Sequence, residues 1–344
     1  MIDEIKKSKL CVGIIGCGKI AETRHAPEYA AEENVRLVGY FDFKTERAAA
    51  LAERFGGRFF SSVEEMLACP EIDAVSVCTA NATHADITIA SLRAGKHVLC
   101  EKPMATTLAE CRNMLSAAKE NGKRLAIAHN QRTCAAHRKA RELLDFGAIG
   151  RPLSFKSFFG HSGPDNWSVD AGTGNWFFDK SQSAFGAVAD LGIHKIDLMR
   201  FLLGSEIESM TAILGTLDKR YPDGTPVNVD DNALILCRMK NGVMGTVTVS
   251  WTCYAEEEND TVIYGTEGRM RINPITGCIT VTKKGGATEE FLAPQGDSTG
   301  VIDVFVSAIL EGSPCDLDAE TIIPSMEAMM AAIKSSESGT SIAL

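Results

Sequence analysis

Three polar side chains recur at helical spacing in the second half of the chain. Asp190 and His194 are four residues apart, and Asp197 follows three residues later, so a helix would carry all three on one face. A lone histidine on an apolar helix is usually a satisfied core residue, but flanking carboxylates favour a catalytic site. Because histidine titrates near neutral pH, we expect His194 to take part in proton transfer. Asp197 is expected to orient the helix or the imidazole.

A second candidate lies in the first third of the chain. The strand-like run His97-Val98-Leu99-Cys100 leads into Glu101-Lys102-Pro103. Proline restricts the preceding residue to an extended backbone, which would hold the Lys102 side chain in a defined direction at the mouth of a site. The alternative is a solvated Glu-Lys pair before a loop.

A glycine-rich turn near the N-terminus would position a nucleotide beside these side chains. The apolar run from Leu10 to Ile15 leads directly into Gly16-Cys17-Gly18-Lys19-Ile20-Ala21, and a helical pattern continues to about Tyr29. In a strand-turn-helix context this G-x-G-x-x-A pattern is the dinucleotide fingerprint, with the diphosphate on the helix N-terminus. A tight turn without a ligand is the alternative interpretation.

An acidic residue stands where the fingerprint requires one. Asp42 follows Ala21 by 21 residues and ends the apolar run that begins at Val35, the place where a carboxylate accepts hydrogen bonds from the adenosine ribose. Asp42 would repel a 2′-phosphate, so NAD is the predicted cofactor. Lys44 and Arg47 are close enough in sequence to compensate a phosphate, which keeps NADP as the alternative.

Strands and helices go on alternating through the first third of the chain, as in a doubly wound parallel sheet. The buried strand Ala74-Val75-Ser76-Val77-Cys78 ends at Thr79-Ala80-Asn81-Ala82-Thr83-His84. Ligands of open parallel sheets bind at the carboxyl ends of the strands. Thr79, Asn81 and His84 are therefore candidates for cofactor contact, with helix capping or loop hydrogen bonds as the alternative.

These motifs together resemble the glucose-fructose oxidoreductase / inositol dehydrogenase (Gfo/Idh/MocA) family. The resemblance is carried by the glycine turn, by Cys78-Thr79-Ala80-Asn81 with His84, by Glu101-Lys102-Pro103, and by Asp190-Leu191-Gly192-Ile193-His194-Lys195-Ile196-Asp197. The chain departs from the family where Ala80 replaces a usual proline and where Phe185-Gly186-Ala187 replaces a run of glycines. The resemblance to the family implies that Lys102, His194 and Asp190 are the catalytic residues. The predicted cofactor-binding residues are Gly16, Gly18, Lys19, Ile20, Ala21, Asp42, Thr79, Asn81, His84, Glu101, Lys102 and Asn130.

The resemblance implies an NAD(P)-dependent oxidoreductase that acts on a secondary alcohol of a sugar, cyclitol or related polyol. The nicotinamide would exchange hydride with the substrate, and the protein would manage the hydroxyl proton. Neutral His194 would take that proton while the Lys102 ammonium stabilises the oxygen, or the two roles would be exchanged. The alternatives are an enzyme that oxidises a glycoside only transiently, a nucleotide-binding sensor, and a structural protein.

The rest of the chain predicts a second domain of a different class. We place an NAD(P)-binding Rossmann domain at residues 1–130 and an α+β domain at residues 131–344, with an open, mainly antiparallel sheet. One face of such a sheet needs covering, so a homodimer or homotetramer is expected.

The aromatic, weakly periodic stretch between residues 160 and 183 is expected to shape the substrate pocket. Trp167 and Trp176 would bind substrate together with Lys102, Asp190 and His194, or would only anchor the loop.

Composition excludes several other classes of protein. The formal charge of −10 over 344 residues opposes nucleic-acid binding. The eleven cysteines show no C-x-x-C pair, so no metal site is predicted. The absence of a long apolar run, and of an apolar leader in residues 1–7, predicts a cytoplasmic protein that does not bind membranes.

Overall fold

The computed structural model describes residues 9–294, 296 and 298–344. The expectation that the chain has no apolar leader falls on residues 1–7, outside the described residues. The chain divides into two compact units. The first comprises the residues up to Thr79, Thr83–Ala128 and Gly300–Glu320, and the second comprises Ala80–Ala82, His129–Thr299 and Thr321–Leu344.

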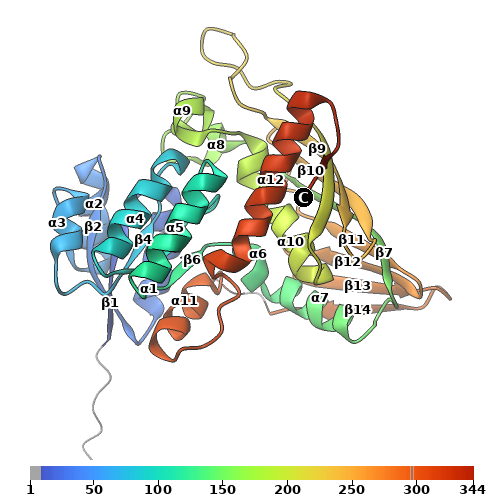
Figure 1. Cartoon of the computed structure of the whole chain (residues 1–344), viewed down its shortest axis with the longest axis horizontal. Helices are drawn as coiled ribbons and strands as arrows, with labels where there is room; N and C mark the ends of the chain where they lie inside the picture. The colour runs from blue at the N-terminus through green and yellow to red at the C-terminus, as the bar shows by residue number, and fades with distance from the viewer. Residues whose placement is uncertain (1–8, 295, 297) are drawn as a thin grey trace, which may run out of the picture. The chain divides into compact units, whose positions relative to one another are not determined.

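The first unit is built on a parallel sheet with the strand order β3-β2-β1-β4-β5-β6 (Figure 1). Its strands are β1 (Leu10–Ile15), β2 (Val35–Phe41), β3 (Arg58–Phe59), β4 (Ala74–Val77), β5 (His97–Cys100) and β6 (Leu125–Ile127). β4 is buried along its whole length, and β1 is buried except for the half-buried Cys11, because helices cover both sides of a doubly wound sheet. The order reverses between β1 and β4, as in a Rossmann domain, so this part of the predicted fold class is confirmed.

Some helices of the first unit begin with side-chain caps. The helices of this unit are η1 (Ala21–His25), α1 (Ala26–Ala31), α2 (Thr45–Phe55), α3 (Val63–Ala68), α4 (His84–Arg93), α5 (Leu108–Glu120) and α11 (Val301–Leu310). Thr107 and Glu110 form a capping box at the start of α5, and the Ser62 hydroxyl accepts from the Glu65 amide at the start of α3, at 3.1 Å. Such caps satisfy amides that the first helical turn leaves without partners.

The segment from residue 300 to residue 320 belongs with the first unit, although the sequence analysis assigns it to the second domain. Helix α11 buries Val301, Ile302 and Phe305 in the same hydrophobic core as Leu10 and Val12 of β1. The chain therefore returns to the first unit after most of the second unit has been built. Hydrophobic periodicity predicts this helix but carries no information about which of two cores it joins.

The second unit contains a larger sheet with the order β14-β13-β12-β11-β7-β10-β9-β8-β15. Neighbouring strands are antiparallel except for β7 and β10, which confirms the predicted mainly antiparallel sheet. The strands are β7 (Pro152–Gly160), β8 (Ile207–Gly215), β9 (Asn232–Met239), β10 (Met244–Ser250), β11 (Thr261–Gly265), β12 (Gly268–Asn273), β13 (Cys278–Lys283), β14 (Thr288–Leu292) and β15 (Ile342–Ala343).

Helices pack against one face of this sheet (Figure 1). The helices of the second unit are α6 (Asn130–Thr133), α7 (Ala135–Asp145), α8 (Pro164–Trp167), η3 (Trp176–Phe178), α9 (Lys180–Ser183), η4 (Val188–Gly192) and α10 (Ile193–Leu203). A last helix, α12 (Ala319–Ser338), begins in the first unit and continues in the second. The stretch predicted as an irregular loop thus contains three short helical turns, α8, η3 and α9.

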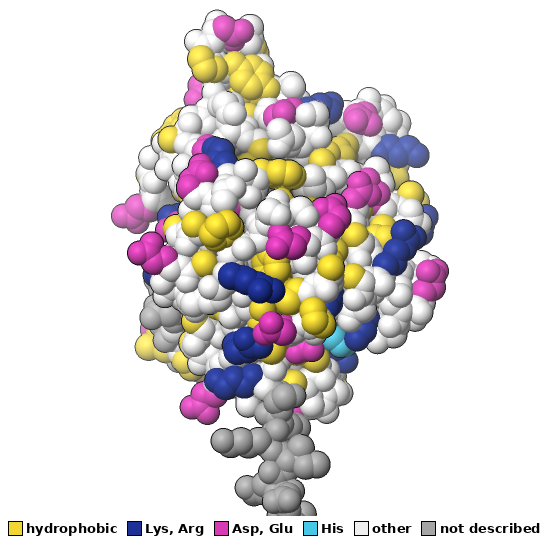
Figure 2. Space-filling view, turned by 90° about the vertical axis from the view of Figure 1, so that its left-hand side faces the viewer, with side chains coloured by type: hydrophobic (Ala, Val, Ile, Leu, Met, Phe, Trp, Pro, Cys, Tyr) yellow, Lys and Arg dark blue, Asp and Glu magenta, His cyan; other side chains and the backbone are white. Residues whose placement is uncertain are grey.

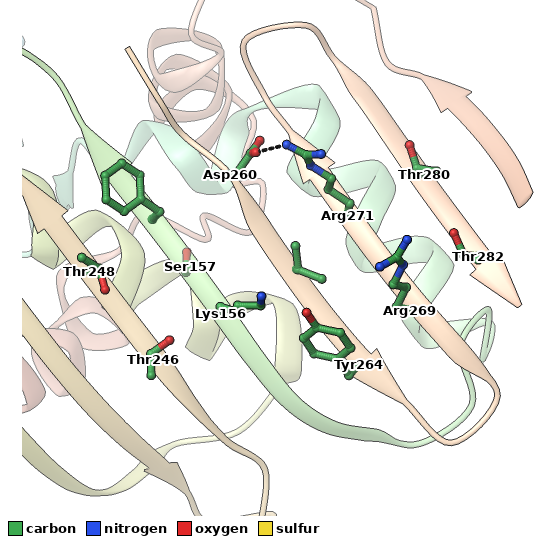
Figure 3. Close-up of a pocket in the computed structure, with 12 residues that line it drawn as sticks. Lys156, Ser157, Thr246, Thr248, Asp260, Tyr264, Arg269, Arg271, Thr280 and Thr282 are labelled. Carbon is green, nitrogen blue, oxygen red and sulfur yellow. Dashed lines mark hydrogen bonds and ion pairs between the residues drawn. The ribbon is translucent and has the colours of Figure 1, made fainter. Parts of the chain in front are cut away.

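The other face of the sheet is open in this chain. Side chains of β9 alternate between buried and exposed positions, and the exposed ones include Leu234 and Leu236. A groove of about 600 Å³ lies on this face. Figure 3 shows Lys156 on β7 and both Arg269 and Arg271 on β12, with β11 between these two strands. The Arg271 guanidinium forms an ion pair with Asp260 at the end of the groove (Figure 3).

The surface view in Figure 2 shows acidic and basic side chains interspersed with scattered apolar ones. Such mixing is typical of the exterior of a globular protein. Within the described residues, no helix is long and apolar enough to span a bilayer.

Candidate active site

The glycine turn after β1 has the backbone that its pattern predicts. Gly16 has a φ of 91°, and a Cβ built on it would lie 2.6 Å from the carbonyl carbon and oxygen of Cys78. Only glycine fits there, and the close approach joins the turn to the end of β4. A Cβ on Gly18 would meet no atom of the described chain within 4 Å, so the backbone has an open side on which a ligand can approach.

Asp42 lies at the carboxyl end of β2 and is tied to the glycine turn. Its Oδ2 accepts a hydrogen bond from the Cys17 amide at 2.7 Å, and its Oδ1 accepts one from the Lys44 amide at 2.8 Å. The carboxylate is thereby held in a fixed direction beside Gly16 and Gly18. Lys19 and Ile20 follow on the helix and are exposed, whereas Ala21 is fully buried against the sheet.

The polar residues after β4 serve mainly to hold the loop in the structure. The Thr83 hydroxyl donates to the Thr79 hydroxyl at 2.8 Å. His84 is buried, and its ring nitrogens lie 2.8 Å from the Pro103 carbonyl and 3.1 Å from the Thr79 carbonyl. The ring thus ties the bend after Lys102 to the end of β4. Cofactor contact by Thr79 and His84 stays a prediction.

Asn81 is grouped with the second unit rather than the first. It is buried, and its amide donates a hydrogen bond to the Ser183 carbonyl at 2.9 Å. This contact corresponds to the loop hydrogen bond that the sequence analysis kept as the alternative. Asn130 begins helix α6, directly after the end of β6, and its cofactor contact likewise stays a prediction.

Glu101 and Lys102 extend from the carboxyl end of β5. The Lys102 backbone amide donates to Glu101 Oε2 at 3.2 Å, and the Lys102-Pro103 peptide bond is cis. Burial would raise the pKa of the Glu101 carboxyl, but the hydrogen bond from His25 and the charge of Lys102 lower that pKa overall. Glu101 is therefore an anion beside Lys102.

In the second unit Asp190 is held by two aromatic side chains. Its Oδ2 accepts a hydrogen bond from the Trp251 indole at 3.0 Å, and His161 Nε2 lies 3.8 Å from the same oxygen. His161 Nδ1 accepts from the Gly163 amide at 2.9 Å. The neutral imidazole therefore carries its proton on Nε2, the nitrogen that faces Asp190.

Asp190 and His194 lie on consecutive stretches of different helix type. Residues 188–192 form the π-helical turn η4, where the Ile193 amide bonds the Val188 carbonyl, and His194 lies in the first turn of α10. Regular helical spacing thus holds only approximately, because the wider π turn displaces Asp190 from its α-helical position. Such turns are frequent at functional sites.

His194 is buried among other rings of the second unit. Its imidazole centroid lies 5.9 Å from that of His129 and 6.2 Å from that of Phe159. His194 is 6% exposed, so one edge of the residue reaches the surface of this unit. A histidine in this position has the access and the dry surroundings that a general base requires.

Asp197 is the centre of a buried ion-pair network, in line with an orienting role. Its two oxygens accept from the Arg132 guanidinium at 2.6 and 2.7 Å, and Oδ1 also accepts from the Ser325 hydroxyl at 2.6 Å. His129 Nδ1 lies 3.4 Å away. Burial would raise the pKa of Asp197, but the charges of His129 and Arg132 and these hydrogen bonds lower it overall.

The two tryptophans predicted to bind substrate belong to one aromatic cluster. Trp167 packs edge-on against His161 at 6.1 Å and against Phe177 at 5.1 Å, between ring centroids. Trp176 stacks on Phe177 at 3.8 Å. Trp167 is 37% exposed and presents an aromatic surface near the His161 ring, so both the pocket and the anchoring interpretation agree with this packing.

Sequence reasoning missed His161 and Trp251, the partners of Asp190. His161 directly follows β7 and Trp251 directly follows β10, so both lie at strand ends, the signal that was applied only to the first domain. Their separations in sequence from Asp190 extend beyond any one helix or strand, so no local pattern links them to Asp190. His25 and Ser76, which bond one another beside Glu101, were also missed.

The first unit has the features that a dinucleotide requires. The open side of Gly18, the fixed Asp42 carboxylate and the polar residues after β5 all lie at carboxyl ends of strands in the same parallel sheet. The second unit holds a carboxylate and an imidazole suited to proton transfer. These properties are those expected of a nucleotide-dependent oxidoreductase.

Comparison with known proteins agrees with that class. Residues 10–129 match the oxidoreductase family with an NAD-binding Rossmann fold, and residues 137–271 match the GFO/IDH/MocA C-terminal domain. The chain belongs to the GFO/IDH/MocA family, as its motifs indicated, and is an NAD(P)-dependent oxidoreductase that acts on CH-OH groups.

Individual relatives match three quarters of the chain or more. The 1,5-anhydro-D-fructose reductase of Ensifer adhaerens is 30% identical over 95% of this chain and 96% of its own length. The myo-inositol 2-dehydrogenase of Thermotoga maritima is 27% identical over 75% and 74%. A levoglucosan dehydrogenase solved with NADH and levoglucosan is 27% identical, covers 98% and 99% of the two chains, and has a TM-score of 0.88.

Proposed function

We propose that this protein oxidises a secondary hydroxyl group of a sugar, cyclitol or related polyol and passes the hydride to NAD. The observation that carries the proposal is the Asp190 carboxylate, held by Trp251 and followed by His194 at the start of α10. Relatives named for cyclic polyhydroxylated compounds support the substrate class. A compound with several hydroxyls suits a site of this polarity with aromatic walls.

The nucleotide is held by the glycine turn and the strand ends of the first unit. Gly16 and Gly18 admit the diphosphate to the backbone amides, and Asp42 accepts the adenosine ribose hydroxyls. The same carboxylate disfavours a 2′-phosphate, so NAD is preferred to NADP. The bound nicotinamide accepts hydride from carbon, and the remaining chemistry is the work of side chains.

In the proposed mechanism, His194 takes the hydroxyl proton of the substrate. The Lys102 ammonium donates a hydrogen bond to the same oxygen and stabilises its negative charge as the proton leaves. Asp190 accepts hydrogen bonds from the substrate and fixes the ring in one orientation. An exchange of the roles of Lys102 and His194 uses the same atoms and stays the alternative.

The open sheet face of the second unit is proposed to bind a second copy of the chain. Ile213 of β8 pairs directly with Leu234 of β9, and these two side chains and Leu236 are between 57% and 70% exposed. An apolar patch with a polar, cationic groove beside it (Figure 3) suits a self-complementary contact. A homodimer or homotetramer follows, and the cytoplasmic location stays a prediction.

The experiment that tests the function begins with protein stripped of nucleotide. Calorimetric titration with NAD⁺ and NADP⁺ is expected to show tighter binding of NAD⁺. A panel of sugars and cyclitols is then screened for the absorbance of reduced nicotinamide, and at least one is expected to react. Tight binding of NAD⁺ without reduction by any member would favour transient oxidation or a sensor instead.

Two variants connect that activity to the proposed residues. Lys102→Met and His194→Ala are each expected to lower kcat by about 100-fold or more, while the Kd for NAD⁺ changes little. Lys123→Met, in the same unit as Lys102, serves as the control and is expected to leave kcat unchanged. Near-normal turnover in both active-site variants would remove the proposed mechanism.

A further inference from the structure

A chain of buried hydrogen bonds runs through the first unit to Glu101. The Tyr29 hydroxyl lies 2.9 Å from Ser76 Oγ, which lies 3.0 Å from His25 Nδ1. His25 Nε2 lies 2.8 Å from Glu101 Oε1. Tyr29, Ser76 and His25 are at most 3% exposed. The chain therefore joins the helical segment after the glycine turn to the end of β5, through the middle of β4.

One assignment of the protons satisfies every group in this chain. Tyr29 donates to Ser76, Ser76 donates to His25 Nδ1, and His25 donates from Nε2 to Glu101 Oε1. Glu101 is then purely an acceptor, because the Lys102 amide donates to its second oxygen. Acceptance of two N–H donors favours the ionised carboxylate.

The charged and titratable groups around Glu101 leave its carboxyl ionised. His25 and Lys102 both lower the pKa of Glu101 against the effect of burial. The buried thiols of Cys78 and Cys100 have pKa values raised first by burial and then by Glu101, so they stay neutral. Burial also lowers the pKa of His84, which keeps that imidazole neutral near pH 7. Glu101 thus remains a fixed anion at the strand end.

We propose that His25 is a positioning residue which, through Glu101, makes the site favour the oxidised cofactor over the reduced one. The oxidised nicotinamide ring carries a positive charge, whereas the reduced ring is neutral. A fixed carboxylate at the strand end therefore stabilises the first form more than the second. The inference rests on the proposed function, and it takes the nicotinamide to lie at the carboxyl end of β5, beside Lys102.

The test compares the affinities of both nucleotide forms. The Kd values for NAD⁺ and NADH are measured by calorimetry and nucleotide fluorescence in the wild type and in Glu101→Gln. Loss of one charge in a partly buried site is expected to weaken the binding of NAD⁺ relative to that of NADH by roughly tenfold. Glu71→Gln is the matched control, because Glu71 is an exposed partner of Arg36 at the amino end of β4.

Two substitutions of His25 separate positioning from simple structural support. His25→Leu removes the donor, so the pKa of Glu101 rises although Lys102 still opposes the effect of burial. The preference for NAD⁺ is therefore expected to become weaker as the pH falls. His25→Gln restores an N–H donor and is expected to keep most of the preference over the same pH range. A purely structural role would weaken both nucleotide forms equally and would not depend on pH.

The outcomes are distinguishable from failure of the proposed function. If the wild type binds neither nucleotide, the proposed function fails. If the wild type binds both nucleotides, the ratio of the Kd values for NAD⁺ and NADH decides the inference about His25. An unchanged ratio in Glu101→Gln and in His25→Leu overturns it, whether the two affinities stay the same or fall equally. Circular dichroism checks folding; should Glu101→Gln be unfolded, the pair His25→Leu and His25→Gln decides the question, because it differs chiefly in the N–H donor.

Discussion

The Asp190 carboxylate accepts a charge-assisted hydrogen bond from the indole of Trp251. Trp251 is fully buried, donates to Asp190 at 3.0 Å, and packs edge-on against Phe178 at a centroid distance of 5.4 Å. A hydrogen bond to a charged acceptor contributes about 1.5–3 kcal/mol. The orientation of Asp190 is therefore set by a residue that does not itself carry out the chemistry.

Trp251→Phe tests that dependence, because phenylalanine keeps an aromatic ring but has no N–H donor. We expect kcat/KM to fall by roughly tenfold on the best substrate found, with a smaller change in the melting temperature. Steady-state kinetics and thermal unfolding measure the two effects. Phe178→Leu alters the same packing but leaves the indole donor in place. It should affect stability more than kcat/KM, and the reverse pattern would count against an orienting role for Trp251.

Single residues were predictable from sequence only where their partners are near in the chain. The spacing of Asp190, His194 and Asp197 pointed to one helix. His194 and Asp197 lie in α10, and Asp190 lies in the π-helical turn η4 directly before it. Trp251 lies 61 residues from Asp190, and Arg132 lies 65 residues from Asp197. Contacts over such separations are set by the sheet topology, which local patterns do not encode.

The helical segment that carries Asp190 is fixed at its start by Asp230. The Asp230 carboxylate accepts from the Gly186 and Val188 amides, both at 2.8 Å. A Cβ on Gly186 would lie 1.8 Å from the Asp230 carbonyl oxygen, so the one glycine in Phe185-Gly186-Ala187 is required by this contact. Just before it, Ala184 has a φ of 65°, a conformation that side chains rarely adopt.

Ala184→Gly should therefore stabilise the protein. Such backbone strain costs about 1–3 kcal/mol, and glycine gives back roughly 0.5–1 kcal/mol through its greater freedom when unfolded. We expect a net gain of about 1 kcal/mol in the free energy of unfolding, measured with urea. Ala187→Gly is the control with the opposite sign, because Ala187 has a helical φ of −57°. Destabilisation by both substitutions would show that Ala184 is not strained.

Helix α10 also carries a lysine that is fully buried in the core of the second unit. Lys195 Nζ donates to Asn259 Oδ1 and lies 5.7 Å from the centroid of the Phe159 ring. Burial lowers the pKa of Lys195 to about 7, against partial compensation by the charge of Asp260. Between pH 7 and about 10, the unfolded chain binds a proton that the folded chain has lost, so stability rises with pH.

Lys195→Met is expected to remove this pH dependence. Relative to the variant, the wild type should gain roughly 3 kcal/mol in the free energy of unfolding between pH 7 and pH 9.5. Urea unfolding at the two pH values measures the difference. Lys284→Met, an exposed lysine of the same unit, should follow the wild type. Equal slopes in the wild type and Lys195→Met would mean that Lys195 keeps an ordinary pKa.

Helices, strands and turns bounded by short turn or capping motifs were predictable from sequence. Elements that pack in a core formed by a distant part of the chain were not. The strand-turn-helix at Gly16, the capped start of α3 and the hairpin turn at Asn241-Gly242 follow from short patterns. Helix α11 was assigned to the second domain, although its apolar face packs in the core of the first. The π-helical turn η4 was not foreseen either, because it depends on the anchoring of its start by Asp230.

At the scale of the whole molecule, the open face of the large sheet should control assembly. The double variant Leu234→Glu/Leu236→Glu places charges on the apolar patch of that face, where burial against a second copy would cost several kcal/mol. We expect a shift from an oligomer to a monomer in light scattering after size-exclusion chromatography. Phe146→Glu changes an 87% exposed side chain outside the sheet and should leave the oligomer intact. An unchanged mass in the double variant would exclude this face as the interface.

The central claim of the proposed function is direct hydride transfer from substrate carbon to NAD. The measurement that tests it uses a sugar or cyclitol from the screen, deuterated at the reacting carbon, with NAD⁺ and product analysis by mass spectrometry. The account predicts one deuterium in the reduced nicotinamide for each ketone formed. Deuterium released to solvent, or product formed without net reduced nicotinamide, would contradict it.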